Sequence, residues 1–223
     1  MWKLQGRACP ALFVVQPRFL PTFFPQLFPA TPHRLTMTIY GAKQLANSFR
    51  TVRKNTIQIA EDIPESQYGF VPAEGTRSVA QMLAHIATLT PLWQDIHGAK
   101  KLTNLDNYDF LAVFSELEAQ EKKKRSKAEI LDLLRTEGEK FAAFLEGLSD
   151  ETLAQEISEP GGGPKKSRLE ALLSAKEHEM HHRGQLMLIE RMLGIVPHLT
   201  KKYAEMEREY KESRQTQTAR QAS

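Results

Sequence analysis

Histidines at helical spacing are the residues of this chain whose chemistry is easiest to infer. His178 and His182 lie four residues apart in the stretch Ser167–Gly194, so on an α-helix they stand on one face, one above the other. That face is otherwise apolar, which predicts that it points into a core. Buried imidazoles need partners, and one divalent metal ion would satisfy both rings. The alternative is a pair of hydrogen-bonded core histidines. His181, about 100° round the helix from His182, is expected beside the site or on the surface.

The helix that carries this pair has recognisable ends. Ser167 and Glu170 form a capping-box pattern, which predicts a helix start. Gly194 is a typical stop.

A third histidine lies on an earlier helix, expected over residues 78–98. Ser78 and Gln81 form a second capping box, and the apolar stripe that follows places His85 on the inward face. Pro91 lies inside this helix and should break or kink it, because its ring clashes with the carbonyl of Ala87. We expect this break to help open a site next to His85.

Two further helices complete the core. Apolar spacing predicts helices over residues 38–62 and 126–148, with a shorter one over 108–121. Four helices with inward stripes predict an all-α, up-down four-helix bundle. No strand pattern is evident. After Pro197, residues 200–214 form a charged extra C-terminal helix, and a disordered tail is expected beyond it.

The domain organisation follows from these patterns. Residues 37–197 form the bundle, and residues 198–223 form the charged helix and tail. Residues 1–36 contain six of the chain's 12 prolines and no acidic residue. Proline at this density forbids a regular helix. We interpret them as an unstructured Pro/Phe-rich leader that need not belong to the native protein, with Met37 as the functional start.

Composition excludes several classes of protein. The single cysteine, Cys9, rules out an internal disulfide and a thiolate-rich metal site. The net charge of +3 comes from four basic residues within 1–36, so the remainder is near neutral and no nucleic-acid partner is expected. The run 121–125, EKKKR, is interpreted as a helix end or solvated face. No stretch is apolar over a membrane-spanning length, and we expect a cytoplasmic protein.

Together His85, His178 and His182 offer three imidazoles from two facing helices. Such a set suits Zn²⁺, Ni²⁺, Fe²⁺ or Cu²⁺. Three protein ligands leave positions open for water or substrate, which is typical of catalytic rather than structural sites.

The contexts of these histidines resemble a known family. YGFVPAEGTRSVAQMLAHIA surrounds His85, and HEMHHRGQL carries the pair in the last core helix. Over about residues 38–195 these motifs are similar to the DinB/YfiT-like metal-binding four-helix bundles. The resemblance implies His85, His178 and His182 as metal ligands with bound water. It implies zinc or nickel as the metal, with Fe²⁺ or Mn²⁺ as alternatives.

The resemblance also implies a homodimer and a small-molecule substrate. Some relatives are thiol-dependent transferases or isomerases that use a low-molecular-weight thiol, and others are metal-dependent hydrolases. Near the ligands, Glu179 and Arg183 are candidate catalytic residues; Arg183 could pair an anionic substrate group. Gln185 could bond the second nitrogen of a ligand ring. These three could equally be helix-surface residues that make local pairs.

Three alternative functions stay open at this stage. His178–His182 also matches the H-E-x-x-H motif of zinc metallopeptidases, with Glu179 as general base and a downstream ligand such as His198, Glu205 or Glu209. A non-enzymatic metal- or ligand-binding stress protein is the second. The third is a structural helical adaptor with ordinary core histidines. An approach of His85 to the pair would favour the bundle site over the peptidase.

Overall fold

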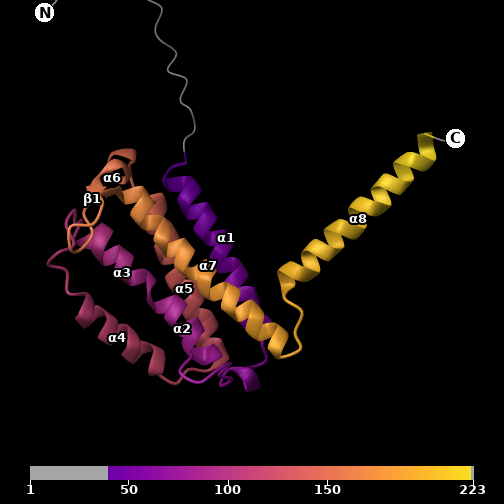
Figure 1. Ribbon diagram of the computed structural model, residues 1–223, viewed down its shortest axis with the longest axis horizontal. Coiled ribbons are helices and arrows are strands. Elements are labelled where there is room, and N and C mark those ends of the chain that lie inside the picture. Colours follow the sequence, from indigo (N-terminus) through magenta and orange to yellow (C-terminus); the bar gives the residue numbers. More distant parts are fainter. Residues whose placement is uncertain (1–39, 222–223) are drawn as a thin grey trace, which may run out of the picture. The chain divides into compact units, whose positions relative to one another are not determined.

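Four helices form the bundle of the computed structural model, which describes residues 40–221 (Figure 1). They are α1 (Ala42–Asp62), α2 (Val79–Thr88), α5 (Lys127–Glu146) and α7 (Arg168–Met192). α1 packs against α5 and α7, and α2 packs against the same two helices. The predicted all-α four-helix bundle is confirmed. The pairing places α1 and α2, neighbours in sequence, at opposite corners, so that α2 faces α7.

The helices begin where serine caps are predicted. Ser78, Ser126 and Ser167 accept hydrogen bonds from backbone N–H groups three residues ahead, at 3.3, 3.3 and 3.1 Å. These bonds satisfy N–H groups that have no partner inside the helix. At the other end of α7, Gly194 adopts a φ of 76°, a conformation that favours glycine after a helix.

The predicted break at Pro91 is confirmed. α2 is followed by the short α3 (Thr90–Gln94) and by a π-helical turn, η2 (Asp95–Ala99). Proline has no N–H to donate, so the carbonyl of Ala87 loses its helical partner. The hydroxyl of Thr90 donates to that carbonyl instead, at 3.3 Å.

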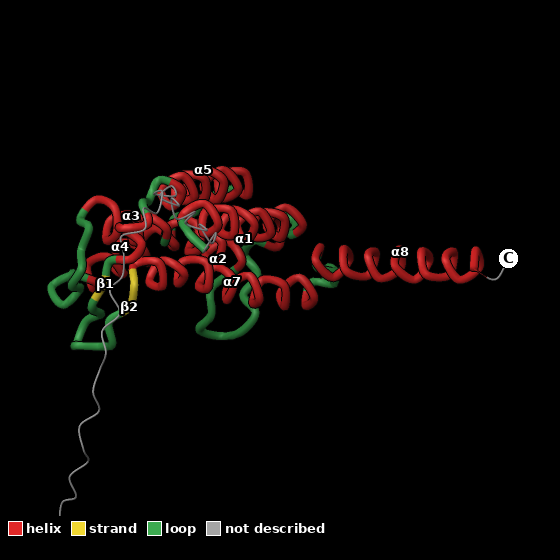
Figure 2. Tube along the Cα trace, turned by 90° about the horizontal axis from the view of Figure 1, so that it is seen from above, coloured by secondary structure: helices red, strands yellow, loops and turns green. Residues whose placement is uncertain are grey.

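The connections contain short elements and one pair of strands. They are η1 (Glu65–Gln67), α4 (Phe110–Lys122), α6 (Asp150–Ala154), β1 (Glu156–Ile157) and β2 (Lys166–Ser167). β1 and β2 pair antiparallel, and they are drawn in yellow in Figure 2. The expectation of no strands is therefore wrong, although four residues leave no apolar periodicity to detect.

The C-terminal helix is longer than predicted. α8 (His198–Gln221) continues through residues where a disordered tail was expected, and the hydroxyls of Thr216 and Thr218 bond carbonyls one turn back. The interpretation of residues 1–36 as a leader lies outside the described residues. None of the described helices is long and apolar enough to cross a membrane.

A polar layer divides the core of the bundle. One apolar cluster contains Phe49, Phe141 and Leu172, and another contains Ile59, Leu134 and Leu186. α1, α5 and α7 each contribute to both clusters. Between the two, these helices carry Arg53, Gly138, and the stretch from His178 to His182. The polar and titratable side chains of this layer thus lie at mid-height of the bundle.

Candidate metal centre

Three imidazoles from two helices converge in this polar layer. Nε2 of His178 lies 2.9 Å from Nε2 of His85 and 3.1 Å from Nε2 of His182. The helical spacing predicts the pair on α7, and the packing of α2 against α7 supplies the third ring. His182 is buried, and the other two are partly buried. Within the described residues, these three form the one group of potential ligands able to hold a metal ion.

Two of the rings are held by hydrogen bonds at their other nitrogen. Nδ1 of His85 lies 2.5 Å from a carboxylate oxygen of Glu121. Nδ1 of His182 lies 2.8 Å from the amide oxygen of Gln185. Both oxygens can only accept, so each Nδ1 carries the proton and each Nε2 presents its lone pair. The predicted hydrogen bond of Gln185 to the second nitrogen of a histidine ring is present, and its role in orienting a metal ligand stays a prediction.

The environment keeps all three rings neutral. Burial and, after it, the neighbouring His182 and His85 together lower the pKa of His178 to about 3. Burial also lowers the pKa of His85, although the hydrogen bond from its ring to Glu121 acts in the opposite direction. For His182, burial again lowers the pKa, against the bond to Gln185. Neutral imidazoles are the form that binds metals.

The arrangement fits a divalent cation better than it fits three uncharged rings alone. A single proton on Nε2 of His178 would have to serve two acceptors, on His85 and His182. A cation would be a partner for all three lone pairs. Ligand nitrogens on a tetrahedral zinc ion lie about 3.3 Å from one another, given Zn–N distances of about 2.05 Å. The two separations from Nε2 of His178, 2.9 and 3.1 Å, are close to that spacing, and all three ligand atoms lie within 4.8 Å of one another.

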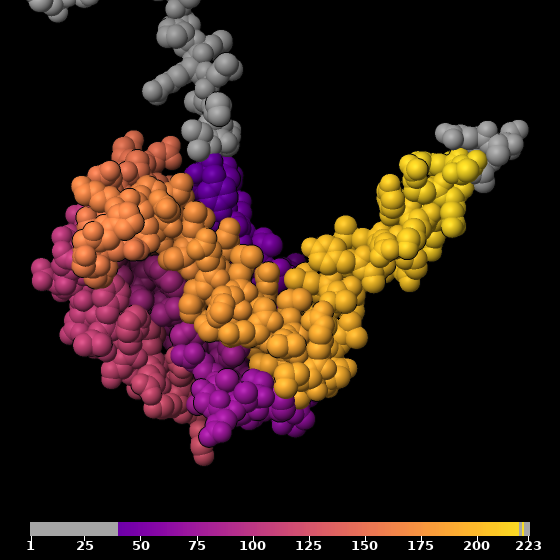
Figure 3. Space-filling model, in the orientation of Figure 1, coloured from indigo at the N-terminus to yellow at the C-terminus, as the bar shows by residue number. Residues whose placement is uncertain are grey.

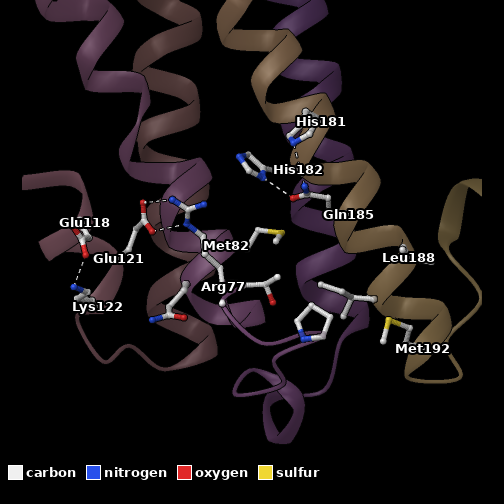
Figure 4. A pocket seen from close by; sticks show the side chains of 15 residues that line it. Arg77, Met82, Glu118, Glu121, Lys122, His181, His182, Gln185, Leu188 and Met192 are labelled. Atoms are coloured by element: carbon white, nitrogen blue, oxygen red, sulfur yellow. Dashed lines mark hydrogen bonds and ion pairs between the residues drawn. The ribbon is translucent and has the colours of Figure 1, made fainter. Parts of the chain in front are cut away.

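A cavity of about 770 Å³ adjoins the cluster at His182, the one ring of the three that lines it. Figure 3 shows the surface hollowed between α7 and α4, and Figure 4 shows the side chains that line the cavity. His181, His182 and Gln185 line it from α7, with Arg77 and Met82 from the region of α2. His181 is exposed and lies 3.1 Å from Nε2 of Gln185, as expected for a residue beside the site.

Glu121 and Arg77 are site residues that the sequence did not single out. Arg77 Nε donates to Glu121 at 2.6 Å, and Glu121 is 8% exposed. The charge run 121–125 contains a helix end, as predicted, since α4 ends at Lys122. Its lysines are exposed, whereas the alternative of a solvated face is wrong for Glu121. The available signal was the helical pattern of α4, which places Glu121 one turn after Leu117, the other buried residue of this helix.

The structure places Glu179 away from the three rings. Its carboxylate oxygens accept from Nε of Arg53 at 2.9 and 3.1 Å, and both side chains are buried. Arg53 also donates to the carbonyls of Leu134 and Ile86. Glu179 thus belongs to an ion pair between α1 and α7. Its catalytic role stays a prediction that no contact in the structure supports.

Arg183 also lies apart from the histidine cluster. It lines a separate hollow with Lys176, His198 and Lys202, and it is not among the residues of the cavity beside His182. Its proposed pairing with an anionic substrate group at the metal has no supporting contact.

The downstream ligands required by a metallopeptidase do not join the pair. Nε2 of His198 lies 3.3 Å from the side chain of Asn55, and Glu205 is exposed beside Arg208. Glu209 is exposed on α8. His85 approaches the pair instead, which favours the bundle site. The two-residue strands β1 and β2 lie outside the lining of the cavity.

A family model of the DinB superfamily matches residues 48–186, and the chain belongs to this superfamily. YjoA of Bacillus subtilis is 30% identical over 154 residues, which span 69% of this chain and 91% of YjoA. The crystal structure of YjoA, a DinB-like protein, aligns with a TM-score of 0.50 over 68% of this chain and 92% of YjoA.

Two solved structures share the fold at lower identity. YfiT from Bacillus subtilis, described as a probable metal-dependent hydrolase with an unusual four-helix bundle topology, is 18% identical. It aligns with a TM-score of 0.56 over 73% of this chain and 93% of YfiT. A mycothiol-dependent maleylpyruvate isomerase is 12% identical, with a TM-score of 0.52 over 65% of this chain and 60% of the isomerase. At these identities the similarity concerns the fold alone.

Proposed function

We propose that this protein is a metal-dependent enzyme acting on a small molecule, with His85, His178 and His182 as the metal ligands. The observation that carries the proposal is the convergence of three Nε2 atoms beside a cavity of about 770 Å³. Three protein ligands leave coordination positions open. A divalent ion bound there would lower the pKa of a bound water or of a substrate thiol.

The residues of the chain would support this chemistry in defined ways. Glu121 keeps the proton of His85 on Nδ1, and Gln185 does the same for His182, so both rings keep Nε2 available as ligands. Arg77 holds Glu121 in place. His181 lies on the cavity wall, where it could bind a polar substrate group or exchange a proton with it.

The reaction class is either thiol-dependent transfer or hydrolysis. YfiT is described as a probable metal-dependent hydrolase, and the isomerase neighbour depends on mycothiol. Both descriptions are consistent with a three-histidine site that activates water or a low-molecular-weight thiol. We propose zinc or nickel as the metal. Three imidazoles suit either ion.

The non-enzymatic alternative has less support. A closed site with no adjoining cavity would suit a metal-binding stress protein, whereas His182 lines an open cavity.

For partners, we propose a homodimer. Tyr203, Met206 and Tyr210 form an exposed apolar line on α8 that a second copy would cover, and light scattering of the full chain tests this.

The first experiment is the metal content of tag-free protein, with His85→Ala beside it. We expect about one divalent ion per chain in the wild type and loss of the ion in the variant, because two remaining imidazoles hold a metal weakly. His198→Ala serves as the matched control and should keep the ion. A wild type that cannot be loaded, or loss of the ion from His198→Ala rather than from His85→Ala, would contradict the proposed site.

A further inference from the structure

Two large apolar side chains on α7 are exposed next to the proposed metal centre. Leu188 is 60% exposed and Met192 is 52% exposed. They are four residues apart, so they form one continuous patch on the helix. Both line the same cavity as His182. Contiguous exposed apolar surface inside a cavity is typical of a binding site.

The face of α7 that lines the cavity changes from polar to apolar side chains along the helix. His181, Gln185, Leu188 and Met192 follow at steps of four, three and four residues, which places them on one side of the helix. Figure 4 shows His182 and Gln185 toward one end of this wall and Leu188 and Met192 toward the other. The wall is therefore polar beside the histidines and apolar farther along.

The other walls of the cavity include residues of α2 and α4. Met82 of α2 faces the same space, as Figure 4 shows, and extends the apolar side. On the side of α4, Glu118 and Lys122 form an ion pair at 2.5 Å and are 64% exposed. An occupant of the cavity would meet apolar surface on α7 and water or paired charges on α4.

The dimensions fit a small molecule rather than a macromolecule. A volume of about 770 Å³ falls within the range of ligand sites, roughly 300–1,000 Å³. The helical rise places Leu188 about 9 Å and Met192 about 15 Å along α7 from His182. A molecule whose head reaches the histidines would have to extend that far to contact both side chains.

We propose that the substrate has a metal-binding polar head and an apolar body comparable to an octyl or decyl chain, the shorter of which reaches Leu188 and the longer Met192. Leu188 and Met192 are the specificity-determining residues that bind the body. This inference rests on the proposed function, since it assigns the head to the three-histidine centre. The occupant is a small molecule because its apolar wall is continuous with that centre within one cavity.

The test is calorimetric titration of the zinc-loaded full chain with alkyl hydroxamic acids of increasing length. Acetohydroxamic acid supplies the head alone, and butyro-, octano- and decanohydroxamic acids add the body. We expect affinity to rise about two- to fourfold for each added methylene. Fourfold is about the gain that complete burial of a methylene would give. Leu188→Gln and Met192→Gln should each weaken the binding of decanohydroxamic acid about tenfold, and leave that of acetohydroxamic acid unchanged.

A matched control separates this effect from a general one. Met180 is on the same helix and 43% exposed, but it lines a different hollow, so Met180→Gln should retain the full gain with chain length. Equal weakening by Met180→Gln and Met192→Gln would overturn the assignment of Met192.

The outcomes distinguish failure of the inference from failure of the proposed function. If acetohydroxamic acid binds and longer acids bind no better, the specificity assignment is wrong while the open metal centre stands. If no hydroxamic acid binds to protein shown to hold zinc, the open centre itself is wrong. If Met192→Gln changes the oligomeric state by light scattering and leaves ligand affinity unchanged, the apolar wall is an interface between copies and the proposal is overturned.

Discussion

Glu121 accepts a hydrogen bond from Nδ1 of His85 at 2.5 Å and one from Arg77 at 2.6 Å. The first bond sets which nitrogen of His85 carries the proton, and the second holds the carboxylate in place. Such outer contacts orient metal ligands and raise their basicity. At the scale of single residues, the centre therefore depends on α4 as well as on the two helices that carry the histidines.

Replacing Glu121 should weaken metal binding without removing a ligand. We expect Glu121→Ala to lower zinc affinity about 10- to 100-fold, and Glu121→Gln to have a smaller effect because its amide oxygen can still accept from His85. Competition with a chromophoric chelator measures both. Glu118→Ala is the control, since Glu118 is exposed on the same helix and pairs only with Lys122. Equal affinities for the two alanine variants would show that Glu121 does not hold the ligand.

At the scale of elements, a buried ion pair joins α1 to α7 in the same polar layer as the histidines. Arg53 and Glu179 are 4% and 2% exposed. Arg53 passes close to Gly138 of α5, where an added Cβ would lie 2.7 Å from Arg53 Cγ. A side chain at position 138 would therefore displace the arginine. The absence of a side chain at Gly138 allows α1 and α5 to pack around this guanidinium group.

Removing one partner of this pair should destabilise the bundle strongly. We expect Glu179→Ala to lower the free energy of unfolding by about 3–5 kcal/mol, because it leaves the buried charge of Arg53 without its partner. Glu139→Ala removes a carboxylate that is 64% exposed and paired with Arg50, and should cost less than about 1 kcal/mol. Urea denaturation of both variants gives the comparison. Similar losses would show that the buried pair contributes no more than the surface pair.

At the scale of the whole molecule, a second polar cluster joins segments that are distant in sequence. Arg168, at the start of α7, is fully buried. Its guanidinium group donates to Nδ1 of His97 at 3.0 Å, to the carbonyl of Leu102 at 3.1 Å and to the side chain of Gln155 at 2.9 Å. Burial, Arg168 and Lys166 lower the pKa of His97 to about 4. The neutral form of His97, which can accept the hydrogen bond from Arg168, is therefore the form favoured in the folded protein.

The depressed pKa of His97 makes stability depend on pH. In the unfolded chain His97 binds a proton below its ordinary pKa of 6.5, and in the folded protein only below about 4. Its contribution is complete above pH 6.5 and is lost as the pH falls to about 4, to a total of about 3 kcal/mol. We expect His97→Gln, measured by urea denaturation across this window, to lose less stability on acidification than the wild type does.

The comparison with His97→Gln is needed because another group acts with the opposite sign. Burial and, after it, the neighbouring Asp62 raise the pKa of Glu190 to about 7. The stability contributed by a protonated Glu190 is complete below its ordinary pKa of 4.5 and is lost as the pH rises through about 7. The wild-type profile contains the effects of these two groups and of the three buried histidines of the candidate metal centre, whereas its difference from His97→Gln isolates His97. Identical profiles for the two proteins would contradict the role of His97.

The sequence by itself determined the four main helices and the inward face on which the three histidines lie. Serine caps at positions 78, 126 and 167 are local hydrogen bonds, so they can be read from neighbouring residues. The same holds for the break at Pro91 and for the facing of His178 and His182. Each follows from steric or hydrogen-bonding rules that act within one or two turns of a helix.

Only the tertiary structure decided what the buried charged side chains contact. Glu179 and Glu121 both occur among charged neighbours, yet one pairs with Arg53 and the other orients His85. These partners are 126 and 36 residues away. Such contacts depend on which helices are neighbours, here α1 with α7 and α4 with α2. Helical periodicity gives the face of a residue, but the side chain across from it is set by the packing of the whole bundle.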